Sequence, residues 1–171
     1  MSDGAQFDGA VTRQYEIELL LQAQLDDARL LQELSARLIQ HHGASDIYDQ
    51  FVDAAIALMH SDFGSMQMLR RDDSGDERLE LIAERAFIPE AAEFWHWVAS
   101  GEGSVCGLAM AAGARVVIED VDAEPAMRGT PDLDMYHLAG MVSMQSTPLR
   151  SRTGLPLGMI STHWREPHTP S

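Results

Sequence analysis

The chain is 171 residues long and carries 12 arginines against 27 aspartates and glutamates, which gives a net charge of −15. This length suits one compact domain with a short appendage, and the 45% of hydrophobic residues suits a buried core. Binding to DNA, RNA or an anionic membrane surface is disfavoured, because these partners require a basic protein surface. The sequence contains no lysine, which excludes a Schiff-base lysine and the lysine-dependent phosphate-binding loop.

Cysteine usage and the lack of targeting segments predict a cytoplasmic location without membrane insertion. Cys106 is the single cysteine, so the chain forms no internal disulfide, which fits a reducing compartment. No apolar run approaches the roughly 20 residues that cross a bilayer. The acidic N-terminus also lacks the basic start and the apolar stretch of a signal peptide.

The N-terminal third predicts a disordered leader over residues 1–14, followed by a long helix over residues 15–42. Glycine and proline are absent between Tyr15 and Gln40, and apolar residues recur there at alternating three- and four-residue steps. This stripe comprises Leu21, Leu25, Ala28, Leu31, Leu34 and Leu38. Two interpretations stay open: a coiled coil between two chains, or a single helix that lies on its own domain.

The remaining chain predicts helices and strands of a single α+β domain. Gly43 ends the long helix, and Ser45 caps a second helix. The expected strands cover residues 63–69, 78–86, 115–119, 142–149 and 155–164. The expected further helices cover residues 90–99, 105–112 and 133–139, and residues 120–130 form a loop. We therefore expect an antiparallel sheet with helices on one face and loops on the other.

Several motifs in the second half resemble the GAF domain family. The central ones are Gly103–Met110 (GSVCGLAM), Arg115–Val121 (RVVIEDV) and Glu124-Pro125. Ala139–Val142 (AGMV), Gln145–Leu149 (QSTPL) and Leu157–Thr162 (LGMIST) are similar to the closing strands of that family. The Gln145–Leu149 motif and residues 162–167 (THWREP) most resemble GAF modules of bacterial two-component sensor histidine kinases.

The resemblance implies a central antiparallel sheet of five or six strands over residues 43–171. Terminal helices would pack on one face, and short helices and loops would enclose a ligand pocket on the other. The closing helix of the family would begin near residues 168–171, so we expect the chain to be a fragment of a longer protein. By this resemblance an output kinase domain would follow in the same polypeptide, and the long N-terminal helix would join two copies into a homodimer.

Candidate ligand-binding residues come from this resemblance and from side-chain chemistry. Aromatic rings and thioethers can shape an apolar pocket, and Tyr136 and His137 offer stacking and proton-exchanging groups. The candidates are Phe87, Trp95, Cys106, Met110, Met127, Tyr136, His137 and Gln145. No metal site is expected, because the acidic Asp120, Asp122 and Glu124 do not continue into a calcium-loop pattern.

The family's known chemistries are disfavoured one by one. Free methionine sulfoxide reductases of the family use several cysteines, whereas Cys106 stands alone and suits a small buried side chain. Residues 133–137 (LDMYH) lack the cysteine that attaches a bilin in phytochrome-like relatives, and haem ligation by His137 is also disfavoured. Cyclic-nucleotide binding in the family uses asparagine and lysine, and this sequence has neither.

Two functions therefore remain as hypotheses. The first is a non-catalytic sensory module that binds a small ligand and relays the event through its flanking helices. The second is a structural homodimerisation module whose pocket is vestigial and holds no ligand. No catalytic triad or metal cluster assembles from the sequence, so an enzyme is not expected.

Overall fold

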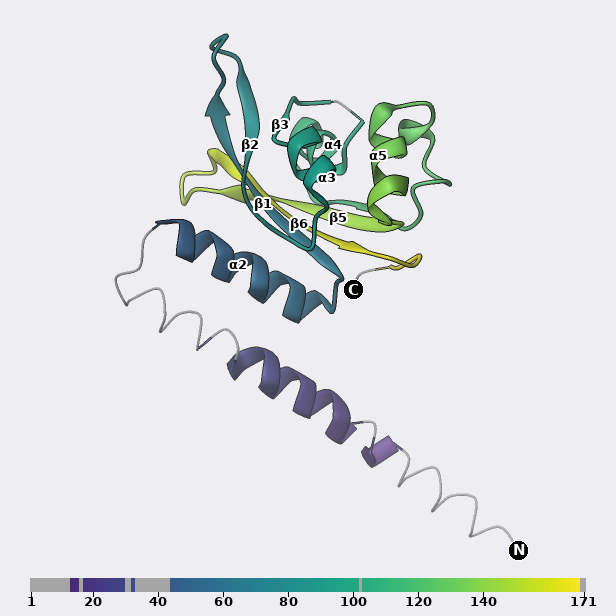
Figure 1. Ribbon diagram of the computed structural model, residues 1–171. Helices are drawn as coiled ribbons and strands as arrows, with labels where there is room; N and C mark the ends of the chain where they lie inside the picture. The colour runs from purple at the N-terminus through teal and green to yellow at the C-terminus, as the bar shows by residue number, and fades with distance from the viewer. Residues whose placement is uncertain (1–12, 16, 30–31, 33–43, 102, 170–171) are drawn as a thin grey trace, which may run out of the picture. The chain divides into compact units, whose positions relative to one another are not determined.

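The computed structural model describes residues 13–15, 17–29, 32, 44–101 and 103–169 (Figure 1). The chain divides into two compact units, residues 1–41 and residues 42–171. In the first unit, residues 13–15, 17–29 and 32 are helical. This helix therefore includes Arg13 and Gln14, two residues earlier than expected, and Gln14 Nε2 donates a hydrogen bond to Glu18 Oε1 over 3.4 Å.

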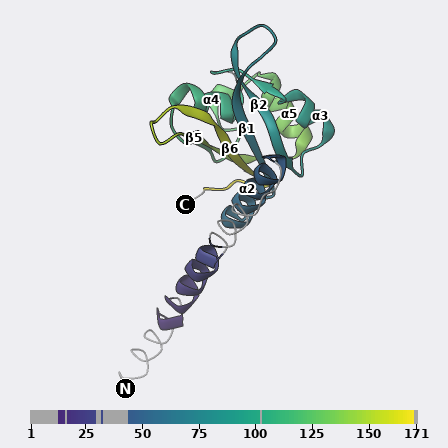
Figure 2. The same cartoon turned by 90° about the vertical axis from the view of Figure 1, so that its left-hand side faces the viewer.

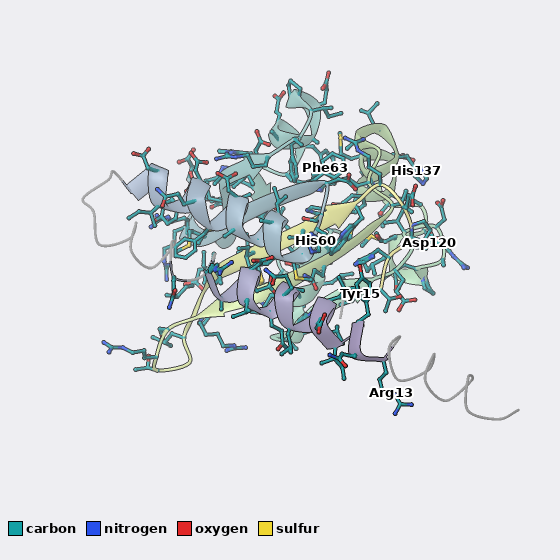
Figure 3. All side chains as sticks on the ribbon, turned by 90° about the horizontal axis from the view of Figure 1, so that it is seen from below. Arg13, Tyr15, His60, Phe63, Asp120 and His137 are labelled. Atoms are coloured by element: carbon teal, nitrogen blue, oxygen red, sulfur yellow. The ribbon has the colours of Figure 1, made fainter. Side chains whose placement is uncertain are left out.

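Part of the predicted apolar stripe lies on this helix, and its described members are exposed. Leu21 and Leu25 each keep 53% of their surface accessible. Leu31, Leu34 and Leu38 lie outside the described residues, as do residues 1–12 of the predicted leader and the predicted break near Gly43. Figure 3 shows the exposed Tyr15 near the start of the same helix.

Helix α2 (Ala44–Met59) begins the second unit and packs on the sheet. It begins one residue before Ser45, so this serine lies inside the first turn rather than at the expected cap. Val52 of this helix is fully buried against Met66 and Ala83 of the sheet, and Phe51 and Ile56 pack on the same cluster. His60 directly follows the helix with a φ of +48°, a left-handed conformation that ends it (Figure 3).

A six-stranded sheet has the order β3-β2-β1-β6-β5-β4, and every neighbouring pair is antiparallel. The strands are β1 (Phe63–Arg71), β2 (Glu77–Arg85), β3 (Trp97–Val98), β4 (Val116–Ile118), β5 (Ser143–Arg150) and β6 (Pro156–Trp164). The antiparallel β1–β6 pair at its centre matches Ser65 with Ser161 and Gly64 with Thr162. Figures 1 and 2 show α2 on one face of this sheet and a layer of short helices on the other.

The short helices on the second face, together with their connecting loops, form a layer that we call the cap. They are α3 (Pro89–Phe94), α4 (Val105–Ala112), the 3₁₀ turn η1 (Pro125–Met127) and α5 (Pro131–Ala139). Helix α4 packs on β4, β5 and β6, and α3 packs on α5. The helix predicted over residues 105–112 is confirmed, and both of its ends are capped: Ser104 Oγ accepts a hydrogen bond from the Gly107 amide, and Gly113 ends the helix with a φ of +60°.

The prediction of a helix over residues 90–99 is wrong in its second half. Helix α3 ends at Phe94, and Trp97–Val98 instead pairs with β2 as the edge strand β3. The Leu81 amide donates to the carbonyl of His96 over 2.9 Å, which draws this segment onto the sheet. Aromatic and β-branched residues favour such extended pairing, and the open edge of β2 supplies the partner.

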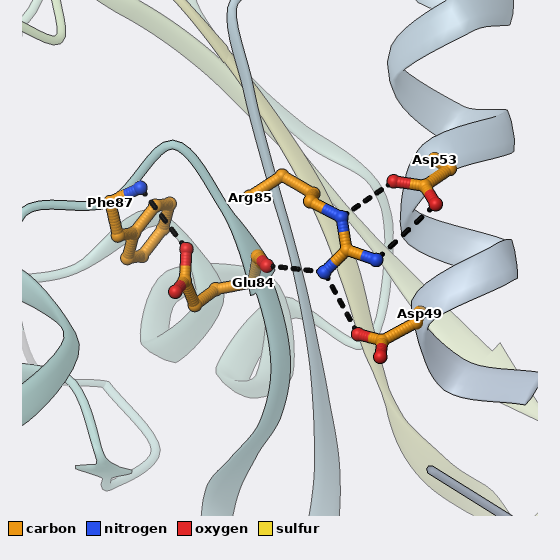
Figure 4. A network of polar contacts seen from close by, with 5 residues as sticks. All are labelled: Asp49, Asp53, Glu84, Arg85 and Phe87. Atoms are coloured by element: carbon orange, nitrogen blue, oxygen red, sulfur yellow. Dashed lines mark hydrogen bonds and ion pairs between the residues drawn. The ribbon is translucent and has the colours of Figure 1, made fainter. Parts of the chain in front are cut away.

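Arg85, at the end of β2, joins the sheet to α2 (Figure 4). Its Nε donates to Asp53 Oδ1 over 2.6 Å, and its Nη1 donates to Asp49 Oδ1 over 2.9 Å. The neighbouring Glu84 turns the other way, and its Oε2 accepts a hydrogen bond from the Phe87 amide over 3.1 Å. Ala86, between Arg85 and Phe87 in the chain, has a φ of +65°, which is uncommon for a residue with a side chain.

None of the helices in the described part of the chain combines the length and apolarity needed to cross a membrane.

The close approach of β6 to β1 leads to a stability prediction. A Cβ atom on Gly158 would overlap the backbone carbonyl of Gln67 and stand 2.9 Å from Met68 Cα. Gly158→Ala must therefore push the central strands apart, and we expect it to lower the free energy of unfolding by about 3 kcal/mol or more. Urea denaturation of the purified protein measures this loss.

The matched control is Gly75→Ala in the β1–β2 turn, where φ is +90° and an added Cβ meets no atom within 4 Å. Backbone strain alone should then cost about 1–2 kcal/mol. Equal losses for the two variants would contradict the close approach at Gly158.

Candidate functional site

A small cavity lies between the centre of the sheet and the cap. Its lining combines three aromatic rings with serine, glutamine, cysteine and histidine side chains. The lining residues are Ser65, Gln67, Phe87, Trp95, Val105, Cys106, Tyr136, Ser161 and His163. The space that the centre of a water-sized sphere can occupy in it is about 10 Å³. That is room for about one water molecule, so the surrounding side chains nearly fill the site.

Aromatic side chains from the cap form one wall of the cavity. The rings of Trp95 and Tyr136 stack with centroids 4.6 Å apart, and Phe87 meets Trp95 edge-on at 6.0 Å. Trp95 Nε1 donates to Asp132 Oδ1 over 2.8 Å, and the Tyr136 hydroxyl accepts from the Val105 amide over 3.1 Å. These bonds hold α3, α4 and α5 together around the cavity.

Polar side chains from β1 and β6 form the opposite wall. Ser65 and Gln67 alternate along β1, and Ser161 and His163 alternate along β6, so all four side chains leave the same face of the sheet. Gln67 Nε2 donates to the carbonyl of Trp95 over 3.4 Å, and Ser161 Oγ pairs with Ser146 Oγ over 2.8 Å. Gln67 Oε1 and both ring nitrogens of His163 are buried without a hydrogen-bond partner among the described residues.

Burial keeps the titratable groups of this cavity uncharged. It raises the pKa of the Cys106 thiol, although a hydrogen bond with Ser104 opposes the shift. Burial also raises the pKa of Tyr136 well above its usual value. It lowers the pKa of His163 to about 3, so the imidazole is neutral at physiological pH. The site therefore offers a thiol, a phenol and a neutral imidazole rather than ions.

The sequence profile of the GAF domain family matches residues 41–171. This chain belongs to the GAF domain family.

Solved structures of low sequence identity share the fold. A GAF domain of a phosphoenolpyruvate-protein phosphotransferase from Coxiella burnetii is 15% identical, with a TM-score of 0.65 over 84% of this chain and 80% of that one. Free methionine-R-sulfoxide reductase from Neisseria meningitidis is 17% identical, with a TM-score of 0.63 over 88% and 79%.

A domain assigned to a two-component sensor histidine kinase of Sinorhizobium meliloti 1021 is 15% identical, with a TM-score of 0.56 over 77% and 79% of the two chains. No curated protein matches this chain. At these identities the neighbours establish the GAF architecture, and the predicted antiparallel sheet and α+β class are confirmed.

Four of the eight candidate residues meet at the cavity of this GAF domain: Phe87, Trp95, Cys106 and Tyr136. Met127 is fully buried and Met110 is half-buried. Both pack in the apolar core of the cap and do not line the cavity.

His137 and Gln145 point away from the cavity, for reasons of local geometry. Neighbours on a helix project about 100° apart, so the inward direction of Tyr136 turns His137 outward, where its Nε2 lies 2.8 Å from Asp122 Oδ1 (Figure 3). Gln145 lies between two residues of β5 that face the cap, Met144 and Ser146. Strand alternation therefore places it on the other face, where its Nε2 donates to Thr162 Oγ1 over 3.1 Å.

Sequence reasoning missed the polar wall and Val105 of this GAF domain. The residues concerned are Ser65, Gln67, Val105, Ser161 and His163. A usable signal existed, because Ser65 and Gln67 alternate with apolar residues in the first half of β1, and Ser161 and His163 stand two residues apart in β6. Polar residues at alternate positions of a central strand share one face, and burial of both faces would have marked them for attention.

Among the described residues of the GAF domain, no group of three or more histidine, cysteine, aspartate or glutamate side chains is arranged to hold a metal ion. The acidic loop after β4 instead stabilises its own backbone. Asp120 Oδ1 accepts from the Asp122 amide over 2.9 Å, and Glu124 Oε1 accepts from the Ala126 amide over 3.1 Å.

The lowered pKa of His163 predicts a pH-dependent loss of stability. The unfolded imidazole titrates near its ordinary value of 6.5, whereas the native one stays neutral down to about pH 3. Between these limits the unfolded state binds a proton that the native state does not bind, so stability falls as the pH falls. From pH 7 to pH 5 the wild type should lose about 2 kcal/mol that His163→Leu does not lose.

Urea unfolding at the two pH values measures the difference. The control is Thr162→Val, the buried neighbour of His163 on the opposite face of the sheet, which should keep the pH dependence of the wild type. A His163→Leu variant with an unchanged pH dependence would show that the pKa of the native imidazole is not lowered, because the native and unfolded states would then bind the same number of protons at this residue.

Proposed function

We propose that this GAF domain is a sensory or regulatory module of a cytoplasmic signal-transduction protein, with a histidine kinase as its output domain. A small molecule binds in the cavity between the sheet and the cap, and the flanking helices relay its presence. The observation that carries the proposal is the set of buried polar atoms in the cavity, on Gln67 and His163, that have no hydrogen-bond partner in the described part of the chain. Such groups are expected to be satisfied by water or a ligand.

The chemistry of the cavity supports binding rather than catalysis. A cysteine nucleophile needs a lowered pKa and a nearby base, whereas the pKa of Cys106 is raised and its Sγ lies 3.3 Å from the hydroxyl of Ser104. The cavity has room for about one water molecule, which argues against a haem or a bilin, and a guest of a few heavy atoms enters only if lining side chains such as Phe87 move.

The segment from Glu84 to Phe87 provides a route from the cavity to α2. Phe87 lines the cavity, and its amide is held by Glu84. Arg85, two residues earlier, is held by Asp49 and Asp53 of α2 (Figure 4). A guest that displaces Phe87 therefore moves the segment that also carries Arg85, which is bonded to α2. Signalling also requires that the guest bind more tightly to the displaced arrangement of this segment than to the original one.

A second candidate function is a homodimerisation module with a vestigial pocket. The small volume of the cavity favours it, since the aromatic wall nearly fills the space. The exposed Leu21 and Leu25 would supply the contact between two copies, which we propose for both candidates.

Calorimetric titration with a panel of metabolites of up to about ten heavy atoms tests the sensory proposal. We expect at least one of them to bind the wild type, and His163→Leu to weaken that binding by at least about tenfold, the loss of one to two hydrogen bonds. Thr162→Val on the opposite face should bind as the wild type does.

Binding that His163→Leu leaves intact would place the guest outside this cavity and contradict the proposal. Failure of every metabolite would favour the second candidate, provided that light scattering finds a dimer which Leu21→Glu and Leu25→Glu together convert to a monomer. A monomeric wild type would contradict dimerisation through this helix.

The route through Arg85 is tested by a double-mutant cycle in the free energy of unfolding. Phe87→Leu and Asp53→Ala should show an interaction energy of at least about 0.5 kcal/mol, because both act on the segment from residue 84 to residue 87. The control pair is Phe87→Leu with Asp46→Ala, an exposed aspartate of the same helix outside the Arg85 contacts. Additive effects in both pairs would show that the cavity and α2 are not coupled through Arg85.

A further inference from the structure

The buried polar groups of the cavity that have no hydrogen-bond partner among the described residues define which hydrogen-bonding groups a ligand needs. Gln67 Oε1 can only accept a hydrogen bond, and a neutral imidazole has one accepting and one donating nitrogen. Gln67 is 3% exposed and His163 is 4% exposed, so bulk water does not satisfy these atoms. A guest that completes them needs at least one N–H or O–H donor for the two acceptors, and it can use an acceptor for the imidazole N–H.

The charges around the cavity restrict the guest further. None of its lining side chains is an arginine, aspartate or glutamate, and its thiol, phenol and imidazole are held neutral by burial. Two acids are bonded to wall residues: Glu84 accepts from the Phe87 amide, and Asp132 accepts from Trp95 Nε1 and adds to the burial that raises the pKa of Tyr136. An anion would lose its hydration without gaining a cation as a partner.

Binding of a cation in this cavity is disfavoured as well. Aromatic faces can attract a cation, but the rings here are engaged with one another, as the stacked Trp95 and Tyr136 show. The Asp132 Oδ1 that approaches the wall is already bonded to the indole of Trp95. Neutral polar chemistry therefore remains the best match to the lining.

We propose that the ligand of this cavity is an uncharged molecule of a few heavy atoms that carries both an N–H or O–H donor and an acceptor, as a primary amide or a small alcohol does. This inference rests on the proposed sensory function and names its ligand class. Gln67 and His163 form the hydrogen bonds with the ligand. The rings of Phe87, Trp95 and Tyr136 limit the size of the ligand.

Three probes of the same planar skeleton test the proposed ligand class: formamide, formate and formamidinium. Each has three heavy atoms. Formamide is neutral with both donors and an acceptor, formate is an anion with acceptors alone, and formamidinium is a cation with donors alone. Nitrogen–proton correlation NMR follows the indole N–H signals of the tryptophans during each titration. Trp95 lies in the cavity wall, whereas Trp164 is a buried neighbour of His163 on the opposite face of the sheet and serves as the internal control.

We expect formamide to shift the Trp95 signal saturably with a Kd of about 1 mM or weaker, the range open to a ligand of three heavy atoms. Formate and formamidinium should bind at least tenfold more weakly, and the Trp164 signal should stay in place. Gln67→Leu and His163→Leu should each weaken formamide binding at least tenfold, whereas Thr162→Val should bind as the wild type does. A wild-type-like pattern of the remaining amide signals confirms that each variant is folded.

Equal or tighter binding of formate or formamidinium would overturn the uncharged class while leaving a ligand cavity in place. An unmoved Trp95 signal with all three probes would overturn the class as well, and the cavity would then hold only water. The metabolite titration separates this result from a failure of the sensory proposal. A charged or larger metabolite that binds through His163 would uphold that proposal and still refute the inference drawn here.

Discussion

The central strands β1 and β6 are covered on both faces, by α2 on one side and by the cap on the other, and the rest of the domain depends on this constraint. Successive residues of β1 alternate between the layers: Met66 packs beneath α2, while Ser65 and Gln67 face the cap. Gly158 lets β6 approach the Gln67 carbonyl more closely than any residue with a Cβ could. A slip of one residue would turn the polar side chains into the apolar cluster beneath α2, so the register is strongly fixed.

This arrangement leaves the centre of the cap face of the sheet polar, although apolar residues such as Phe63 and Met159 surround it on the same face. Leaving a buried donor or acceptor unpaired costs about 1–3 kcal/mol, and the imidazole of His163 and the amide of Gln67 both carry unpaired atoms among the described residues. Apolar side chains of similar volume would avoid that cost. Polar groups retained at such a position are more readily explained by binding than by stability, even though the volume of the cavity is small.

The sequence predicts the elements of this fold wherever a local signal decides them. Ser104 and Gly113 delimit α4 because capping depends on neighbouring residues alone. Trp97–Val98 escaped prediction because its pairing partner, β2, lies far away in the sequence. The site divides in the same way: the aromatic Trp95 and Tyr136 could be named in advance, but the inward direction of His163 and the outward direction of Gln145 depend on strand register, which the sequence alone does not specify.

The connection after β2 shows how one short segment can serve both layers. Arg85 reaches α2, Phe87 reaches the cavity, and Ala86 between them takes a left-handed conformation that reverses the direction of the chain. Such a conformation is unfavourable for a residue with a Cβ and persists only where its surroundings fix it. The contacts of Glu84 with the Phe87 amide and of Arg85 with Asp53 provide that support from opposite sides. A guest that moves Phe87 would therefore weaken the support of Ala86, and the ion pairs with α2 would have to readjust.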